Sequence, residues 1–456
     1  MKEKIRIASG QGFWGDLIDA PFHQVTKGKV DYLVMDYLAE VTMSILQKQK
    51  IKNPALGYAR DLPDLMKRIL PICFEKGVKV ITNGGGVNPA ACADAILEIA
   101  RTLNIKKLVI AVVTGDDIHD KIDEIIAVGC ELNNMDTDES IIKYKDKLVS
   151  ANVYFGAAPI VEALQKGADV VITGRTTDTG LTLAPMIYEF GWDQNNFDLM
   201  AAGTVAGHIL ECGAQSSGGN FLGDWKSVDN MAEIGFPIAE AYPNGEVIIT
   251  KHSGTGGKVT FDTVAEQLVY EIGDPSSYIT PDCVADFRSI ELEDLGNDRV
   301  KVYGVKGKEA TAFYKVSCAY ADGYSASGSL TYSWPEALTK AEAADKILRK
   351  RLDDLALKFD EIRTEFIGYN STHGPLSVKI DEDKINEIML RVAVRSKDYE
   401  SVKRFGMEIA PLILTGPPSV TGFAGGRPKP SEVIAYWPAL IPKKLVRPAV
   451  EIRELK

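Results

Sequence analysis

Residues 5–16, IRIASGQGFWGD, place a short apolar run directly before a loop that contains three glycines. Such a run, ending in a glycine-rich loop, is typical of the first strand and first turn of an α/β fold. The loop has the G-x-G-x-x-G spacing of a dinucleotide site, and Asp36 follows it at about the distance of the acid that binds ribose. Pro21 opposes this interpretation, because a proline in the second turn of the crossover helix removes a backbone donor. We therefore do not expect NAD, and we expect the backbone at Gly10 and Gly12 to hold a substrate anion.

The same alternation of apolar runs and helical stretches continues through the first half of the chain. The runs lie at 31–36, 78–82, 108–113, 152–156 and 169–173, and the helical stretches at 63–77, 89–104 and 120–129. This order predicts a mostly parallel sheet with helices on both faces.

The spacing of apolar residues changes after about residue 230. Segments 246–264 and 298–334 alternate with period two, as antiparallel strands do, and a charged amphipathic helix at 336–359 follows them. We therefore predict an α/β protein with two domains. The first is an α/β domain with glycine-rich ligand loops over 1–228, and the second is an α+β domain over 229–456.

Composition limits the classes of function. The chain has 456 residues and a formal net charge of −11, which opposes binding to nucleic acid. No apolar run approaches the roughly 18 residues of a membrane span, and the start lacks an apolar export segment, so we expect a cytoplasmic protein without a membrane partner. Six scattered cysteines without a C-x-x-C pair disfavour a zinc or iron–sulfur site of close cysteine spacing. An acidic enzyme of this size is commonly a symmetric oligomer, and we expect a homo-oligomer.

Two later loops follow predicted strands, where ligands of α/β folds bind. The first comprises Asn83, Gly84, Gly85 and Gly86 and leads into a helix, so its backbone can approach an anionic ligand closely. The alternative is a plain strand-to-helix turn.

The second loop, at 173–180, carries Arg175 and Asp178. An arginine fork can hold a carboxylate or phosphate by two hydrogen bonds, and Asp178 can orient that arginine or act as a base. Alternatively, the two side chains form a local salt bridge that fixes the loop.

The densest polar cluster lies at 207–220. His208 and Glu211 are three residues apart, so on a helix they share a face and can serve as an acid–base pair or as two metal ligands. Cys212 is a candidate nucleophile whose pKa depends on which helix end holds it. Gln215 and Ser217 are candidates for binding substrate.

Two outlying residues complete the candidates. His252 stands in the glycine-rich stretch HSGTGG, and it is either a general acid–base group or part of a surface hairpin. Arg427 stands in a glycine- and proline-rich stretch at 421–430 that is either a substrate-binding loop or a linker.

Several of these motifs together resemble the acyclic terpene utilisation (AtuA) family over about residues 5–445. They are GQGFWGD, NGGGVNPAA, TGRTTDTGLTLAP, AGHILECGAQSSGG, TKHSGTGG, EQLVYEIGDPSSYITPD and GGRPKPSEV. The resemblance implies a role in the catabolism of branched acyl compounds or small carboxylic acids, and it assigns no catalytic residue. Some members carry a further small ferredoxin-like domain at the C-terminus. This chain ends at Lys456, so we expect that module to be absent and to be supplied by a separate small protein where it is required.

These observations favour a lyase of the hydratase or dehydratase type. Its substrate would be a small unsaturated or hydroxylated branched acid, similar to mesaconate or citramalate, or the acyl-CoA ester of such an acid. If a divalent metal assists, the first ligands to test are His208, Glu211 and Asp178. The alternatives are acyl transfer or thioester hydrolysis by Cys212, and a noncatalytic binding subunit that needs a small partner.

Overall fold

The computed structural model describes residues 2–422 and 425–455. The chain divides into two compact units, one formed by Met1–Ala319 with Tyr436–Lys456 and the other by Tyr320–Ala435.

The first unit is built on a ten-stranded sheet with the order β11-β12-β8-β7-β1-β2-β3-β6-β4-β19. Its centre is parallel and consists of β1 (Ile5–Gln11), β2 (Tyr32–Met35), β3 (Lys79–Thr82), β6 (Val170–Thr173) and β4 (Leu108–Thr114). Antiparallel strands extend both sides, namely β7 (Ile238–Ala241), β8 (Val247–Thr250), β12 (Val300–Tyr303) and β11 (Glu291–Asp294), and β19 (Ala449–Leu455) beyond β4.

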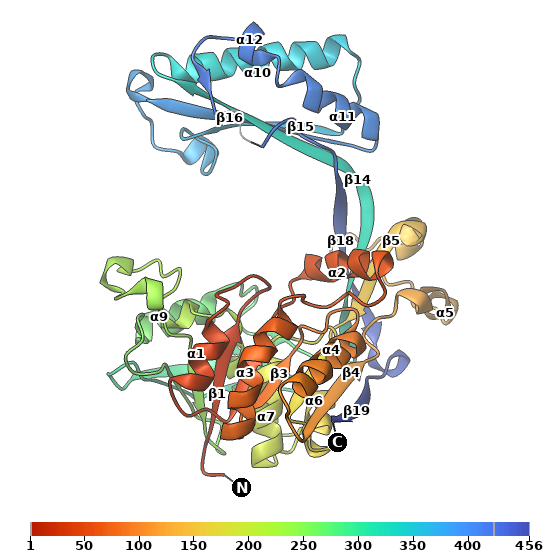
Figure 1. Ribbon diagram of the computed structural model, residues 1–456, viewed down its shortest axis with the longest axis vertical. Coiled ribbons are helices and arrows are strands. Elements are labelled where there is room, and N and C mark those ends of the chain that lie inside the picture. Colours follow the sequence, from red (N-terminus) through yellow and green to blue (C-terminus); the bar gives the residue numbers. More distant parts are fainter. Residues whose placement is uncertain (1, 423–424, 456) are drawn as a thin grey trace. The chain divides into compact units, whose positions relative to one another are not determined.

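Helices cover both faces of this sheet because neighbouring strand residues point to opposite faces and both sets are apolar. Ile7 and Val34 pack into one core, and Ala8 and Leu33 into the other. The first core includes residues of α6 (Ala158–Gln165), α7 (Gly180–Phe190), α8 (Phe197–Glu211) and α9 (Phe261–Val269). The second includes residues of α1 (Ala20–Thr26), α2 (Glu40–Lys52), α3 (Leu62–Lys76) and α4 (Pro89–Thr102) (Figure 1). The predicted α/β class is confirmed.

Smaller elements complete the first unit. A three-stranded sheet of β13 (Lys306–Lys308), β10 (Val284–Asp286) and β9 (Tyr278–Ile279) packs against α8. Helix α5 (Ile122–Ala127) follows β4.

The strand expected at 152–156 does not join the parallel sheet, so that prediction was wrong. The strand in this region is β5 (Leu148–Val153), which pairs with β14 (Phe313–Ser333). The free edge of β4 is instead taken by β19 from the end of the chain, in an antiparallel register that runs from Ala449 opposite Thr114 to Leu455 opposite Leu108.

The division between the units differs from the boundary predicted at residue 228. Strands β7, β8, β11 and β12 continue the sheet of the first unit, so the chain leaves that unit only after Ala319. The period-two pattern that suggested a new domain marks the antiparallel side of the same sheet.

The second unit has its own fold. Strand β14 leads to α10 (Ala337–Asp354), β15 (Glu361–Ile367), β16 (Glu387–Ser396), α11 (Tyr399–Glu408), the short α12 (Leu412–Thr415) and β17 (Val420–Thr421). The sheet order β15-β16-β14-β17 is antiparallel throughout, and α10 and α11 share one core with it. This β-α-β-β-α-β order is the split βαβ, or ferredoxin-like, topology. Strand β18 (Ser431–Pro442) then returns the chain to the first unit.

A substitution at Gly85 tests the packing between the ends of β3 and β6. A Cβ atom there would lie 2.5 Å from the Thr173 carbonyl oxygen and 2.6 Å from the Pro89 side chain. We expect Gly85→Ala to lower the free energy of unfolding by about 1–3 kcal/mol, measured by urea denaturation. Gly273→Ala is the matched control, because its Cβ would meet no atom within 4 Å. Equal stability of the two variants would contradict the packing described here.

Candidate active site

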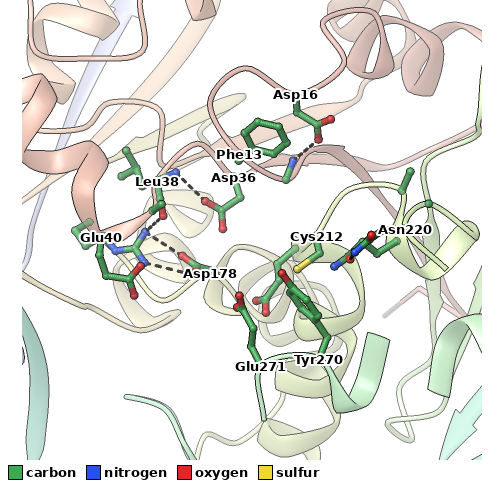
Figure 2. Close-up of a pocket in the computed structure, with 17 residues that line it drawn as sticks. Phe13, Asp16, Asp36, Leu38, Glu40, Asp178, Cys212, Asn220, Tyr270 and Glu271 are labelled. Carbon is green, nitrogen blue, oxygen red and sulfur yellow. Dashed lines mark hydrogen bonds and ion pairs between the residues drawn. The ribbon is translucent and has the colours of Figure 1, made fainter. Parts of the chain in front are cut away.

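A pocket of about 520 Å³ lies at the carboxyl ends of β1, β2 and β6 (Figure 2). Its walls come from the loops after these strands, from the C-terminal end of α8 and from the residues that follow α9. This is the edge at which open α/β sheets bind their ligands. Of the residues proposed from sequence, Gly12, Arg175, Asp178, Glu211, Cys212 and Gln215 line it.

The guanidinium of Arg175 is buried and bonded within the protein. One nitrogen, Nη1, donates to the Leu38 carbonyl and lies 3.1 Å from Asp178 Oδ1, and the group stacks 4.2 Å from the centre of the Tyr154 ring. Burial opposes its charge, but Asp178 and Tyr154 hold the pKa of Arg175 above its usual value. These contacts support the salt bridge that fixes the loop, rather than a fork that is free to hold a substrate carboxylate.

Asp116 anchors the loop that carries Arg175. Its Oδ2 accepts hydrogen bonds from the Arg175 backbone N–H at 2.8 Å and from Asn152 Nδ2 at 3.0 Å. Burial raises the pKa of Asp116 to about 7. Gly174 is required beside it, because a Cβ atom at that position would lie 2.3 Å from Asp116 Oδ1.

Asp36 is a buried carboxyl group in the wall of the pocket. Its Oδ1 accepts hydrogen bonds from Asn83 Nδ2 at 2.7 Å and from the Leu38 backbone N–H at 3.1 Å. Burial raises its pKa well above the ordinary value, and the charge of Asp178 adds to this. Asn83 does not line the pocket, and its role is to hold Asp36. Burial therefore favours the acid form of Asp36 compared with an exposed carboxyl group.

His208 and Glu211 form a hydrogen-bonded pair at the end of α8. His208 Nδ1 lies 2.9 Å from Glu211 Oε1, and its Nε2 lies 2.9 Å from the Gln267 carbonyl oxygen. His208 is 2% exposed and its ring packs against the rings of Tyr278 and Phe287, so Glu211 faces the pocket while His208 lies behind it. The i, i+3 spacing on a helix explains the contact.

Both pKa shifts of this pair favour a retained proton. Burial lowers the pKa of His208, but the hydrogen bond and charge of Glu211 outweigh it and raise that pKa above its usual value. For Glu211, burial raises the pKa more than the contact with His208 lowers it. Each shift stabilises the state with a proton between Nδ1 and Oε1, and Glu211 can exchange that proton with a ligand.

Cys212 lines the pocket in surroundings that disfavour a thiolate. It caps the C-terminal end of α8, where the helix dipole is negative. Burial, together with the charge of Glu211, raises the pKa of its thiol to about 12. Both ring nitrogens of His208 already face oxygen partners, so His208 is not positioned to activate the thiol. These contacts argue against Cys212 as a nucleophile.

His252 lies outside the pocket. It follows β8, its Nε2 lies 2.9 Å from the Gln24 carbonyl oxygen, and burial lowers its pKa. A Cβ atom at Gly28 would lie 2.2 Å from its Nδ1, so the ring is enclosed by the end of α1 and the loop after it. The structure does not bring His252 together with His208 and Glu211.

The other predicted substrate-binding residues have packing roles in the structure. Gly10, Gly84 and Gly86 leave room for the side chains of Leu33, Leu62 and Leu46, respectively. Gly85 lies against the Thr173 carbonyl, and Ser217 Oγ donates to the Gly235 carbonyl at 2.6 Å. Arg427 is exposed in the second unit, and residues 423 and 424 of its stretch lie outside the described residues.

The opening glycine loop serves the pocket by close packing. A Cβ atom at Gly12 would lie 2.6 Å from the Gly213 backbone nitrogen, so Gly12 lets the loop contact the end of α8. Asp16 Oδ2 accepts from the Gly12 backbone N–H at 2.9 Å and folds the loop back. Pro21 lies at the start of α1, which begins at Ala20, and not in a second helical turn as the sequence suggested. A proline there loses no helical hydrogen bond.

Sequence reasoning missed several residues that line the pocket, among them Asp16, Asp36, Glu40, Tyr270 and Glu271. Asp36 had a detectable signal, because it directly follows an apolar strand, but the sequence suggested a ribose contact for it. Tyr270 and Glu271 follow a helix that reaches the site only through the tertiary fold. Within residues 2–422 and 425–455, no group of three His, Cys, Asp or Glu side chains is arranged to hold a metal ion, so His208, Glu211 and Asp178 do not form such a set.

Comparison with known families gives one match. The model of the acyclic terpene utilisation family protein AtuA matches residues 5–452. The chain belongs to this family. The matched range spans both units and every residue of the pocket, so the pocket lies within the part that this AtuA member shares with the family model.

Comparisons with curated proteins and with solved structures gave no match. In the part of the chain that the structure describes, no helix has the length and apolar character needed to cross a membrane.

Alkylation tests the state of Cys212. Because its thiol pKa is about 12, we expect iodoacetamide at pH 8 to modify Cys212 about 100-fold or more slowly than free cysteine. Peptide mass spectrometry after timed quenching gives the rate for this residue. A rate equal to that of the free amino acid would restore Cys212 as a candidate nucleophile.

An NMR titration tests the His208–Glu211 pair. We expect the pKa of His208 to lie above its usual value in the wild type and to be lower by about 1 to 3 pH units in Glu211→Gln. In that variant, burial still lowers the pKa, but the carboxylate that raises it is gone. Signals that disappear in His208→Gln identify the ring. The same midpoint in the wild type and in Glu211→Gln would contradict the pairing.

Proposed function

We propose that the pocket catalyses reversible addition of water to a small unsaturated acyl compound, as a hydro-lyase. The substrate is a branched unsaturated or hydroxylated acid or its acyl-CoA ester. The Glu211–His208 pair in the wall of a 520 Å³ pocket carries this proposal, because hydration requires a group that exchanges a proton with the substrate.

Two carboxyl groups from different elements supply the proton transfers. In the dehydration direction, Glu211 removes the proton from the carbon next to the acyl group, and Asp36 in its acid form protonates the departing hydroxyl group, which leaves as water. In the hydration direction, the water oxygen bonds to the β-carbon while the same groups exchange protons in reverse. The raised pKa of each carboxyl group suits such transfers, because a carboxyl that holds its proton more tightly can both donate and accept it during the reaction.

His208 is a positioning residue in this scheme, since it lies behind Glu211 and does not line the pocket. It fixes the orientation of the Glu211 carboxyl and shares its proton. The proposal requires no thiolate from Cys212. The homo-oligomer and the small ferredoxin-like partner stay predictions from the sequence.

Turnover by Glu211→Gln tests the proposal. Purified protein is incubated with a panel of α,β-unsaturated branched acids and their thioesters, and hydrated product is quantified by mass spectrometry. We expect Glu211→Gln to reduce the rate by about 10²–10⁴-fold, as the loss of a general acid–base group does. Glu293→Gln is the matched control, because Glu293 is exposed on β11 and does not line the pocket.

Two results would contradict the proposal. Glu211→Gln at nearly the wild-type rate would remove Glu211 from the chemistry. Binding of panel compounds by the wild type without any product would favour the alternative of a noncatalytic binding subunit.

A further inference from the structure

We infer that the pocket binds the uncharged acyl part of an ester or thioester and discriminates against the free carboxylate of the same acid. The inference rests on the proposed function and chooses between the two substrate forms that the proposal leaves open.

The charges of the pocket wall are the first observation. Six acidic residues line the pocket, namely Asp16, Asp36, Glu40, Asp178, Glu211 and Glu271. Among the described residues that line it, Arg175 is the one with a basic side chain, and its guanidinium is already engaged by Asp178 and the Leu38 carbonyl. A substrate carboxylate would therefore find no uncommitted positive charge in the wall.

Protonation does not remove this excess of negative charge. With one proton on Asp36 and one on the Glu211–His208 pair, four acidic groups still face one guanidinium. Lys315, which is not part of the lining, lies 3.6 Å from Glu40 and offsets that carboxylate in part. The remaining field repels an anion, and a pocket with low-dielectric walls strengthens this repulsion compared with an open surface.

Uncharged groups in the wall are the second observation. Asn220 Nδ2 donates to Gln215 Oε1 at 3.0 Å, and Gln215 Nε2 donates to Gln267 Oε1 at 3.1 Å. An amide NH₂ has two hydrogens and Asn220 uses one in its contact with Gln215, so Asn220 retains an N–H for a carbonyl oxygen, whereas Gln215 also contacts the Cys212 thiol. Leu38 and Ala39 supply apolar surface beside the acidic groups.

Aromatic rings offer surface for the alcohol or thiol portion of such a substrate. Phe13 is 56% exposed and Tyr270 is 39% exposed, and both line the pocket (Figure 2). Exposed aromatic rings can pack against an uncharged alcohol or thiol portion, but they offer no positive charge to a carboxylate. The amides, the rings and the negative field together fit an acyl ester or thioester.

The test is a pair of binding measurements that require no turnover. Titration calorimetry at pH 7.5 compares the saturated branched acid with its N-acetylcysteamine thioester, which is uncharged and cannot be hydrated. We expect the thioester to bind at least 30-fold more tightly than the acid. Added salt should reduce the ratio of the two affinities, because screening weakens the repulsion of the acid and leaves binding of the uncharged thioester unaffected.

Glu271→Gln separates charge from the extra contacts of the thioester. Glu271 is exposed and lines the pocket, so neutralising it should reduce the thioester-to-acid ratio about fivefold. Glu293→Gln, which removes the same charge outside the pocket, should leave the ratio unchanged.

The outcomes distinguish this inference from the proposed function. Tighter binding of the acid, equal binding, a ratio that Glu271→Gln does not move, or binding of neither ligand would overturn the inference. Because these ligands do not react, a thioester preference without hydration of any unsaturated thioester would overturn the proposed function and leave the inference standing.

Discussion

The buried guanidinium of Arg175 is the interaction on which the rest of the pocket depends. It joins the loop after β6 to the loop after β2 through the Leu38 carbonyl, and it offsets the charge of Asp178. Asp116 fixes the backbone from which this side chain extends. A buried guanidinium without its carboxylate partner is strongly destabilising, so the pairing with Asp178 is needed to keep Arg175 in this position. The arginine thus supports the site structurally and is not available to hold substrate.

Around this centre, the fold brings together two carboxyl groups whose pKa values are raised by burial. The charge of Asp178 raises the pKa of Asp36 further, whereas the contact with His208 on the same helix partly offsets the effect of burial at Glu211. The two groups come from a strand end and a helix end, so their environments can differ within one cavity. The proposed acid–base chemistry on an uncharged acyl group would use this combination.

The sequence predicts local features of this protein well and long-range ones poorly. The apolar runs ending in loops at Gly12 and Arg175 were sufficient to place those loops at one edge of a parallel sheet, and the i, i+3 spacing identified the His208–Glu211 contact. The antiparallel edge strand β19 and the contribution of Glu271 depend on contacts between segments far apart in the chain. His252 lies in a glycine-rich stretch that resembles a ligand loop, but its ring is used in packing against α1.

The most direct test of this account concerns the proton on Asp36. Infrared difference spectroscopy of the wild type against Asp36→Asn at pH 7 detects the C=O stretch of a protonated carboxyl group, which shifts in heavy water. We expect the spectrum of the wild type minus that of Asp36→Asn to show this band, because the contributions of carboxyl groups common to both proteins, such as Asp116 and Glu211, cancel. Absence of the band from this difference spectrum would contradict the claim that the pocket keeps a proton on Asp36 at neutral pH.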